Sequence, residues 1–315
     1  MKHKFSTLLI ALFWDWFVGD PPNRFHPVAW MGRGIAWSKR CCRFSAPIVQ
    51  FGHGVLIVAM GGGAVWSIIH WLERGLQQLP SGLSLLTEAW LMKQTFSVRG
   101  LYRATGDVQQ ALARGDLAEA RHWLGWHLVS REVSTLDESE VAAATIESLA
   151  ENTSDGIIAP WWWYMVGGLP LAFLYRFVNT ADAMLGYRDA RHEWLGKTAA
   201  RLDDLLNLIP ARLTAMFFVL TSGRSRIRAW RVWRRDARLT ASPNAGHPMS
   251  AMAGALGVRL EKKDHYTLGA ELPPPQPVHL ARARRFLLLL TLISAGLSLL
   301  LVTFSPSHRS KNKCG

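Results

Sequence analysis

The sequence predicts an all-α, polytopic integral membrane protein with about four to five transmembrane or re-entrant helices and helical hydrophilic loops. Hydrophobic residues make up 49% of the 315-residue chain and occur in blocks. A helix of about 20 apolar residues crosses a bilayer, and five blocks approach that length, at 6–19, 48–72, 157–178, 205–221 and 286–304. No alternating strand pattern of useful length lies between them, so helix is expected throughout.

The first and last blocks differ in character. The last carries no charge and has basic residues on both sides, as expected for a transmembrane helix. The first is short, contains Asp15 and lacks a small-residue cleavage site, which indicates a retained or re-entrant segment and not a signal peptide. Basic residues follow the first, third and fourth blocks, and five full crossings cannot place them all on one side. We therefore expect the first block, or the third with Pro160 and Pro170, not to span.

Residues 1–315 are treated as one membrane domain, which contains two hydrophilic regions. The first, 73–156, is predicted to be helical, with Asp107 and Asp116 as N-caps. Ser134 and Thr135, followed by Asp137 and Glu138, resemble a capping box that starts a helix near 136–152. The run NTSDG (152–156) predicts a turn after it.

The second hydrophilic region, 222–283, is predicted to be a basic loop region with a Pro-rich linker at 271–277. Seven arginines lie within 224–238, and the whole chain has a net charge of +13. Because the arginines directly follow an apolar block, a membrane surface or phosphorylated ligands are favoured as their partners. No nucleic-acid module is recognised, so nucleic acid is not an expected partner. Three cysteines form neither a disulfide framework nor a metal motif.

Polar residues gather at both ends of the third block. Glu140, Glu147 and Glu151 share one helical face. Glu147 and Glu151 repel each other, and a shared Mg²⁺ would relieve the repulsion; a solvated acidic face is the alternative. Asn152 and Asp155 follow, and could bind a polar ligand.

Beyond the block, Asn179, Asp182 and Arg188 form a second polar set. A third set follows on 197–213, where the side chains on one stripe are Lys197, Arg201, Asp204 and Arg212. Pro210 is predicted to kink this segment. The stripe is either a ligand site beside freed backbone groups or an intrahelical ion pair of Arg201 with Asp204.

The loop GDPPNRFHP (19–27) places Asp20 and His26 on a rigid turn. His26 or His247 is either a general base or a turn histidine. The sequence GKT at 196–198 is not a P-loop, because the first required glycine is Arg191.

Five runs together resemble the CobD/CbiB family of cobalamin biosynthesis, the adenosylcobinamide-phosphate synthases. They are GDPP…HPV (19–28), ESLAENTSDGIIAP (147–160), RFVNTADAMLGYR (176–188), ARLDDLLNLIPARL (200–213) and SPNAGHPMSAMAGALGVRLEK (242–262). His247 stands where an aromatic residue is expected in many relatives.

The resemblance implies an enzyme that attaches (R)-1-aminopropan-2-ol, or its O-phosphate, to the ring D propionate of (adenosyl)cobyric acid. ATP, with Mg²⁺, would drive this amide formation. The resemblance also implies a multi-pass protein of the bacterial inner membrane, in contact with lipid, and allows a homo-oligomer or association with other cobalamin enzymes. An AmpE-like membrane sensor and a small-molecule transporter are the competing interpretations.

The residue types fit this chemistry, and the roles assigned to them are our hypotheses. The catalytic candidates are Glu147, Glu151, Asp155, Asp182 and Asp204, of which Glu147 and Glu151 are the candidate Mg²⁺ ligands. Asp203 is a further candidate for holding metal or orienting the amine. The candidates for binding substrate or phosphate are Asn152, Asn179, Arg188, Arg201, Arg212, Asn244, Asp20 and His26.

Overall fold

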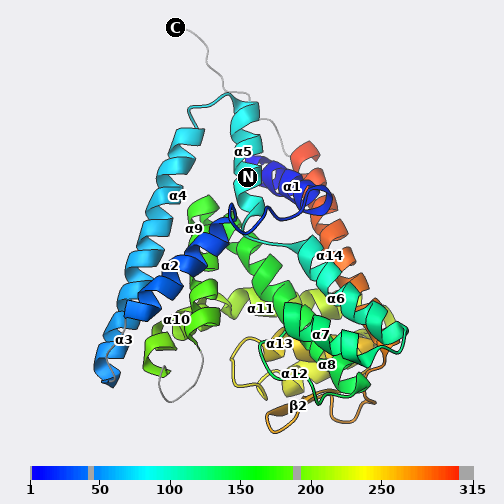
Figure 1. Ribbon diagram of the computed structural model, residues 1–315. Coiled ribbons are helices and arrows are strands. Elements are labelled where there is room, and N and C mark those ends of the chain that lie inside the picture. Colours follow the sequence, from blue (N-terminus) through cyan, green and yellow to red (C-terminus); the bar gives the residue numbers. More distant parts are fainter. Residues whose placement is uncertain (1, 42–45, 187–192, 305–315) are drawn as a thin grey trace.

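The computed structural model describes residues 2–41, 46–186 and 193–304. Helices dominate this part of the chain (Figure 1). The N-terminal elements are α1 (Lys2–Phe17), α2 (Pro27–Cys41), α3 (Pro47–Leu56), the π-helical turn η1 (Ile57–Gly61), α4 (Gly62–Leu76), α5 (Ser81–Lys93), α6 (Val98–Ala113) and α7 (Leu117–His127). The remaining elements are α8 (Glu138–Thr153), the π-helical turn η2 (Ser154–Ile158), α9 (Ala159–Leu185), α10 (Glu193–Leu206), α11 (Leu208–Thr221), the 3-10 turn η3 (Gly223–Ser225), α12 (Arg226–Asp236), α13 (Gly246–Leu256), β1 (Leu260–Lys262), β2 (Tyr266–Leu268) and α14 (Pro277–Phe304).

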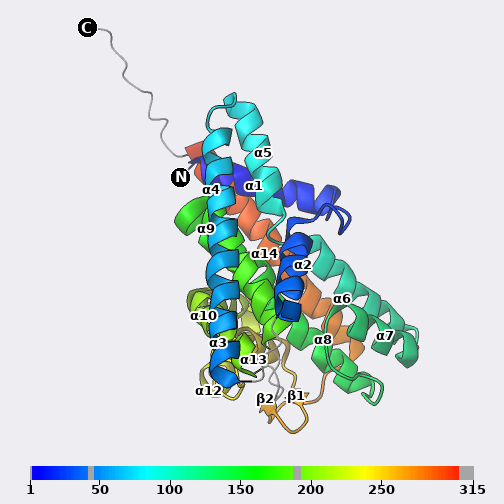
Figure 2. The same cartoon turned by 60° about the vertical axis from the view of Figure 1, so that its left-hand side comes forward.

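Three helical segments are long and apolar enough to cross a membrane: Pro47–Leu76, Glu138–Leu185 and Pro277–Leu300. A fourth arises if α10 and α11, which meet at 48°, form one broken span. Figure 2 shows α3, η1 and α4 as one long helix at the front of the molecule. The prediction of an all-α polytopic membrane protein is confirmed.

The segment Glu138–Leu185 does not run straight, because it folds back inside α9. Gly167 and Gly168 have non-helical dihedrals, with φ +72° at Gly168. The Tyr175 hydroxyl consequently lies 3.0 Å from the carbonyl oxygen of Asp155, although 20 residues of straight helix would separate them by about 30 Å. We call residues 138–185 the α8–α9 hairpin. Both of its ends open on the same side of the molecule.

Glycine is required at the tip of the α8–α9 hairpin. A Cβ on Gly168 would lie 2.6 Å from Oε1 of Glu73, the oxygen that accepts a hydrogen bond from the Leu169 amide at 3.3 Å. Pro170 fits here because it stands in the first turn of the second leg, where its missing N–H costs nothing. Pro170 was one reason to predict that the third block does not span, and the break in α9 at Gly167 and Gly168 lies just before it.

Replacing Gly168 by alanine is expected to destabilise the protein by about 1–3 kcal/mol, because its backbone conformation is essentially restricted to glycine. Thermal unfolding of the detergent-solubilised protein measures this. Gly63→Ala is the matched control, since a Cβ there meets no atom within 4 Å. Equal melting temperatures for the two variants would contradict the assigned turn.

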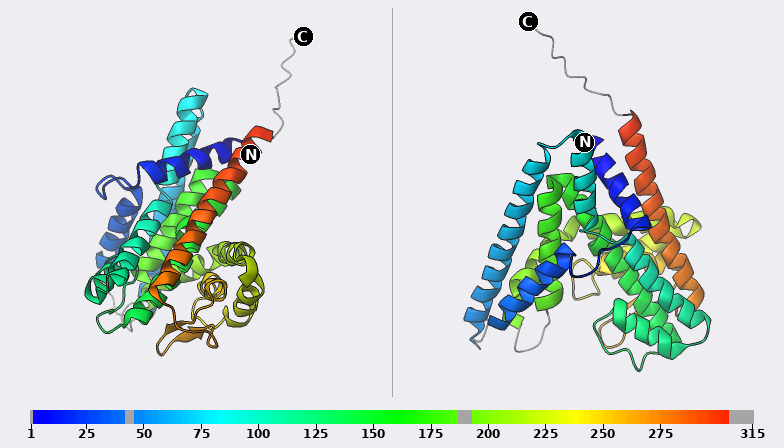
Figure 3. Two further views of the ribbon diagram at one scale, coloured as in Figure 1. Left: turned by 90° about the vertical axis from the view of Figure 1, so that its right-hand side faces the viewer. Right: turned by 45° about the horizontal axis from the view of Figure 1, so that its top comes forward.

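Three buried clusters hold the helices together. The largest joins α6, α7 and α8 to α11, α12, α13, the β1–β2 hairpin and the start of α14. A second joins α1, α5, both legs of α9 and α14. The third joins α2, η1 and α10 to the second leg of α9. Figure 3 shows that the β hairpin lies beside the lower end of α14. The polar ends of α8, α9 and α10 therefore lie near α12 and α13.

Several local predictions are corrected. Asp116 caps α7 as expected, but Asp107 lies inside α6, whose N-cap is Ser97. The capping box that starts α8 is formed by Asp137 and Glu140, and not by Ser134 and Thr135. The predicted turn at 152–156 is helical, because tertiary packing buries Thr153 and Ser154 and overrides the local turn preference.

The region 222–283, predicted to be a loop, contains α12, α13 and a short antiparallel β hairpin. The arginine-rich run forms a helix because Ala229, Val232 and Trp233, spaced at helical intervals, are buried against the core. The two strands, each three residues long, were not predicted. The Pro-rich segment does lead into α14, which begins at Pro277.

Candidate functional site

A cationic pocket of about 710 Å³ lies between α10, α11 and the loop before α13. Lys197, Arg201 and Asp204 line it from α10, and Arg212 lines it from α11. These are the four side chains of the predicted 197–213 stripe, so the structure brings them together. The remaining lining residues are Gly186, Glu193, Gly196, Ala200, Arg238, Thr240, Ala241, Ser242, Pro243 and His247. Four basic side chains against two carboxylates favour an anionic ligand.

The bend between α10 and α11 opens this pocket. Pro210 has no N–H, so the Leu206 carbonyl loses its helical donor. The indole nitrogen of Trp163 donates to that carbonyl at 3.2 Å instead. The chain bends by 48° at Asn207, one turn before Pro210. This bend places Arg212 opposite the basic side chains of α10.

Asn244 holds the wall of the pocket. It is 4% exposed, and its amide nitrogen donates to the Asp204 carbonyl at 2.6 Å. Its amide oxygen accepts from Arg212 at 3.3 Å. Ser242 Oγ lies 3.4 Å from Oδ1 of Asp204 and also accepts a hydrogen bond from the backbone N–H of Asn244. Asn244, a predicted substrate contact, therefore positions Arg212 and the end of α10.

His247 faces the pocket as a neutral hydrogen-bond donor. Its Nδ1 accepts from the indole nitrogen of Trp233 at 2.9 Å, so the proton lies on Nε2. Burial, followed by the charges of Arg212 and Arg238, lowers the pKa of His247 to about 4. A general-base role, one of its two predicted roles, would need a free nitrogen lone pair, and this tautomer offers none.

The low pKa predicts how stability changes on acidification. Unfolded histidine titrates near 6.5 and folded His247 near 4, so between these values the unfolded state binds more protons. Stability should therefore fall as pH drops from about 6.5 towards 4, by about 1–2 kcal/mol after allowance for solvent screening. Thermal unfolding at several pH values measures this. His247→Gln should flatten the profile, whereas identical profiles for variant and wild type would contradict the assignment.

A buried polar cluster lies on the other face of α10. Asp203, 8% exposed, accepts from the amides of Asn179 at 3.2 Å and Asn207 at 2.9 Å. The Tyr175 hydroxyl is shared between the Asn207 amide oxygen and the Asp155 carbonyl. The two consecutive aspartates therefore lie on different faces of α10. Asp203 binds α10 to the α8–α9 hairpin, and Asp204 lines the pocket.

Glu151 and Asp155 belong to the same buried region, since both interact electrostatically with Asp203. The fold-back at Gly167–Gly168 is what allows Asn179, from the far end of the third block, to join them. A straight crossing would have placed these residues on opposite sides of the membrane. The candidate residues from both ends of this block therefore lie at one pole.

Glu147 is 5% exposed, which excludes the solvated-face alternative for this residue. Arg131 lies 3.9 Å from its Oε2, and Lys262 acts electrostatically on both Glu147 and Glu151. These two cations offset the carboxylate repulsion for which Mg²⁺ was invoked. Glu140, on the same face, pairs with Lys263 at 2.5 Å.

The donor set for a metal is small. Among the residues that the structure describes, no group of three or more His, Cys, Asp or Glu could hold a metal ion. Magnesium, however, needs only one or two carboxylates when phosphate oxygens complete its shell. Oε1 of Glu147 is a buried oxygen without a hydrogen-bond donor in the described structure. Glu147 and Glu151 therefore fit Mg²⁺ that is bound together with a phosphorylated substrate. The Mg²⁺ site stays a prediction.

The other candidates are less central. Asp182 lies beside pocket residue Gly186, where an added Cβ would be 2.4 Å from the Asp182 Oδ1. The Asn152 amide bonds back to the carbonyl and hydroxyl oxygens of Ser148 within its own helix. Arg188 lies outside the described residues.

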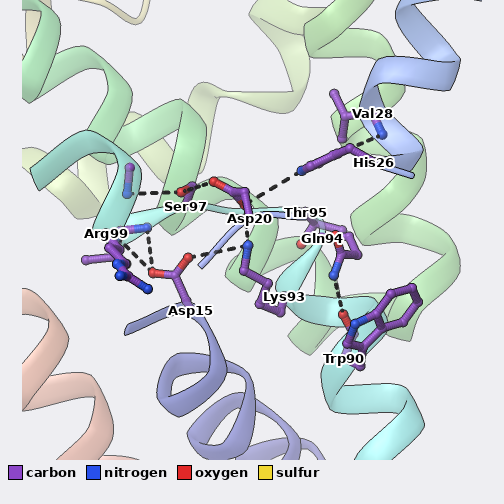
Figure 4. A network of polar contacts seen from close by, with 12 residues as sticks. Asp15, Asp20, His26, Val28, Trp90, Lys93, Gln94, Thr95, Ser97 and Arg99 are labelled. Carbon is purple, nitrogen blue, oxygen red and sulfur yellow. Dashed lines mark hydrogen bonds and ion pairs between the residues drawn. The ribbon is translucent and has the colours of Figure 1, made fainter. Parts of the chain in front are cut away.

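Asp20 and His26 do not line the pocket and instead tie the GDPP loop to the start of α6 (Figure 4). Asp20 accepts hydrogen bonds from Lys93 and from Ser97, the latter at 2.7 Å, and lies 3.7 Å from Nε2 of His26. Burial would raise the pKa of Asp20, but the contacts with His26 and Lys93 hold it well below its usual range. Asp15 completes the network by accepting two backbone N–H groups at the start of α6. These contacts hold the loop against α6, and the predicted role of Asp20 and His26 in substrate binding stays a prediction.

Sequence reasoning did not single out Arg238, Thr240 or Glu193, all of which line the pocket. Arg238 was counted only as one of seven clustered arginines. Its position in the sequence could have identified it, because Arg238 is the last arginine of the cluster and lies close before the Ser242–Asn244 loop.

Comparisons with known proteins agree on one family. The family described as CobD/Cbib protein matches residues 8–287. The cobalamin biosynthesis protein CobD of Dehalococcoides mccartyi is 42% identical over 272 residues, which cover 85% of this chain and 88% of the relative. The probable CobD of Methanothermobacter thermautotrophicus is 39% identical over 84% of this chain and 86% of its own length. The cobalamin biosynthesis protein CbiB of Salmonella typhimurium is 36% identical over 82% of each chain. No solved structure matches the chain.

Proposed function

Since the chain belongs to the CobD/CbiB family, and so has a role in cobalamin biosynthesis, we propose that it catalyses ATP-dependent amide formation between cobyric acid and an aminopropanol. The acceptor is the ring D propionate of (adenosyl)cobyric acid, and the amine is (R)-1-aminopropan-2-ol or, preferentially, its O-phosphate. The product is (adenosyl)cobinamide or its phosphate. The enzyme acts as a multi-pass protein of the bacterial inner membrane.

One observation supports this proposal most strongly. Two of the runs that resemble the family, 200–213 and 242–262, contribute lining residues to the cationic pocket. Two others, 147–160 and 176–188, supply the buried cluster behind α10. Segments distant in sequence thus bring charged and polar side chains together beside one pocket, as expected for an active site.

The chemistry requires activation of the carboxylate, because a carboxylate does not condense with an amine in water. Phosphoryl transfer from ATP to the propionate would give an acyl phosphate and ADP. Attack by the amine nitrogen then forms the amide, while inorganic phosphate leaves and the amine loses a proton. Mg²⁺, when bound, would neutralise charge on the transferring phosphoryl group.

The pocket residues fit defined roles in this reaction. Arg212 and Arg238 would bind the phosphate of the amine substrate, since guanidinium groups bind phosphate oxygens bidentately. Asp204 would orient the amine and accept its proton. Nε2–H of His247 would donate a hydrogen bond to the bound anion. Glu147, Glu151 and Asp155 are the proposed contacts for Mg²⁺ and ATP.

The experiment supplies purified full-length protein with cobyric acid, ATP, Mg²⁺ and aminopropanol phosphate, and weighs the corrinoid product by mass spectrometry. An ATP-dependent mass increase equal to the amine minus water is expected. Folded protein that forms no such product would refute the synthase and favour a sensor. Uptake of labelled aminopropanol into proteoliposomes without amide formation would favour a transporter.

A further inference from the structure

A second basic pocket, of about 320 Å³, lies where α11, η3 and α12 meet residues 282–289 of α14. Its charged residues are Arg228, Arg282 and Arg285. Three hydroxyl side chains complete its polar wall: Thr221, Ser222 and Ser225. No carboxylate is among the described residues that line it, so nothing inside the pocket neutralises the three positive charges.

The three arginines differ in how they are held. Arg228 is fixed, because its Nε donates to the Gly254 carbonyl at 2.8 Å and its Nη2 donates to Ser225 Oγ at 2.9 Å. Arg282 and Arg285 are exposed and make no hydrogen bond or ion pair to any residue in the described ranges. One guanidinium is therefore preorganised, and two others are available to a ligand.

The opposite wall of this pocket is apolar and belongs to a membrane helix. Phe286 and Leu289 line the pocket at the beginning of the apolar block 286–304 of α14. This block overlaps the candidate span Pro277–Leu300. Beyond them α14 continues with exposed Leu292 and Ile293. Figure 1 shows α14 rising from the level of α12 and α13 towards the top of the molecule. The pocket thus lies at the foot of an exposed apolar helix.

The neighbouring helix α11 has the same character. Its side chains Leu213, Met216 and Leu220 are exposed at helical intervals, so they form an apolar stripe that ends beside Thr221. The arginine and hydroxyl groups could bind the phosphate of a phospholipid, and the two exposed apolar faces beside them could contact its acyl chains.

We propose that this pocket binds the headgroup of an anionic phospholipid, with its acyl chains along α14 and α11. A free phosphate would use the arginines but not the apolar wall, which is why a lipid is the better fit. Each arginine near an anionic headgroup contributes about a fivefold gain in affinity. The proposal concerns a site separate from the cationic pocket and does not depend on the proposed reaction.

Native mass spectrometry of the full-length protein, titrated with phosphatidylglycerol or phosphatidylcholine, tests this proposal. Arg282→Gln/Arg285→Gln should weaken phosphatidylglycerol binding by about fivefold for each arginine removed, with little change for phosphatidylcholine. Arg231→Gln/Arg234→Gln is the matched control, since it removes two exposed α12 arginines that do not line the pocket, and it should bind like wild type.

Three results would overturn the proposal. One is unchanged phosphatidylglycerol binding in the pocket variant. Another is an equal loss in the control variant, which would mean that only overall charge matters. The third is complete displacement of the lipid by excess inorganic phosphate, which would assign the pocket to small anions.

Discussion

Replacing Asp204 by asparagine is expected to lower kcat/KM for amide formation by about 100-fold, within the range for loss of a general base. The carboxylate lies in the cationic pocket, where it can accept the proton that the amine releases. Asparagine preserves the size of the side chain and can still accept from Ser242, but it cannot take up that proton. Steady-state product formation measured by mass spectrometry provides the rate.

Glu193→Gln is the control for this substitution, because Glu193 lines the same pocket from the other end of α10. Both variants remove one negative charge. A loss confined to Asp204→Asn supports a specific role in proton transfer. Equal small losses in the two variants would mean that Asp204 acts only through its negative charge and not in proton transfer.

The double variant Arg212→Gln/Arg238→Gln is expected to raise KM for the phosphorylated amine by about 100-fold, since a hydrogen bond to a charged group contributes about 1.5–3 kcal/mol. The rate with the unphosphorylated amine should change much less, because that substrate lacks the group that the arginines bind. The ratio of kcat/KM for the two amines is the quantity to measure. A uniform loss with both amines would indicate a damaged pocket and not lost phosphate recognition.

Sequence alone predicted which side chains line the pocket better than it predicted the arrangement of the surrounding helices. Lys197, Arg201 and Asp204 share a face of α10 by helical periodicity, which is a local property, whereas Arg212 reaches the pocket across the bend between α10 and α11. The arrangement of the third block did not follow, because its apolar run hides the fold-back at Gly167–Gly168. A Gly-Gly-Leu-Pro sequence is a readable signal for a helix end followed by a new helix start.

Tertiary contacts account for the other differences. Asp20 and His26 were predicted to bind substrate, but the contacts of Asp20 with Lys93 and Ser97, which are distant in sequence, were not predicted. The turn residues at 152–156 form a helix because the buried core selects it over their intrinsic preference. Neither outcome can be read from local sequence, since each depends on which helices pack together.

Calorimetric binding of aminopropanol phosphate to the purified protein, with Mg²⁺ and a non-hydrolysable ATP analogue present, tests the central claim most directly. The cationic pocket predicts saturable binding to wild type and to Arg282→Gln/Arg285→Gln. It predicts about 100-fold weaker binding to Arg212→Gln/Arg238→Gln. Equal binding by all three proteins, or a loss only in Arg282→Gln/Arg285→Gln, would contradict the assignment of the substrate phosphate to the pocket between α10 and α11.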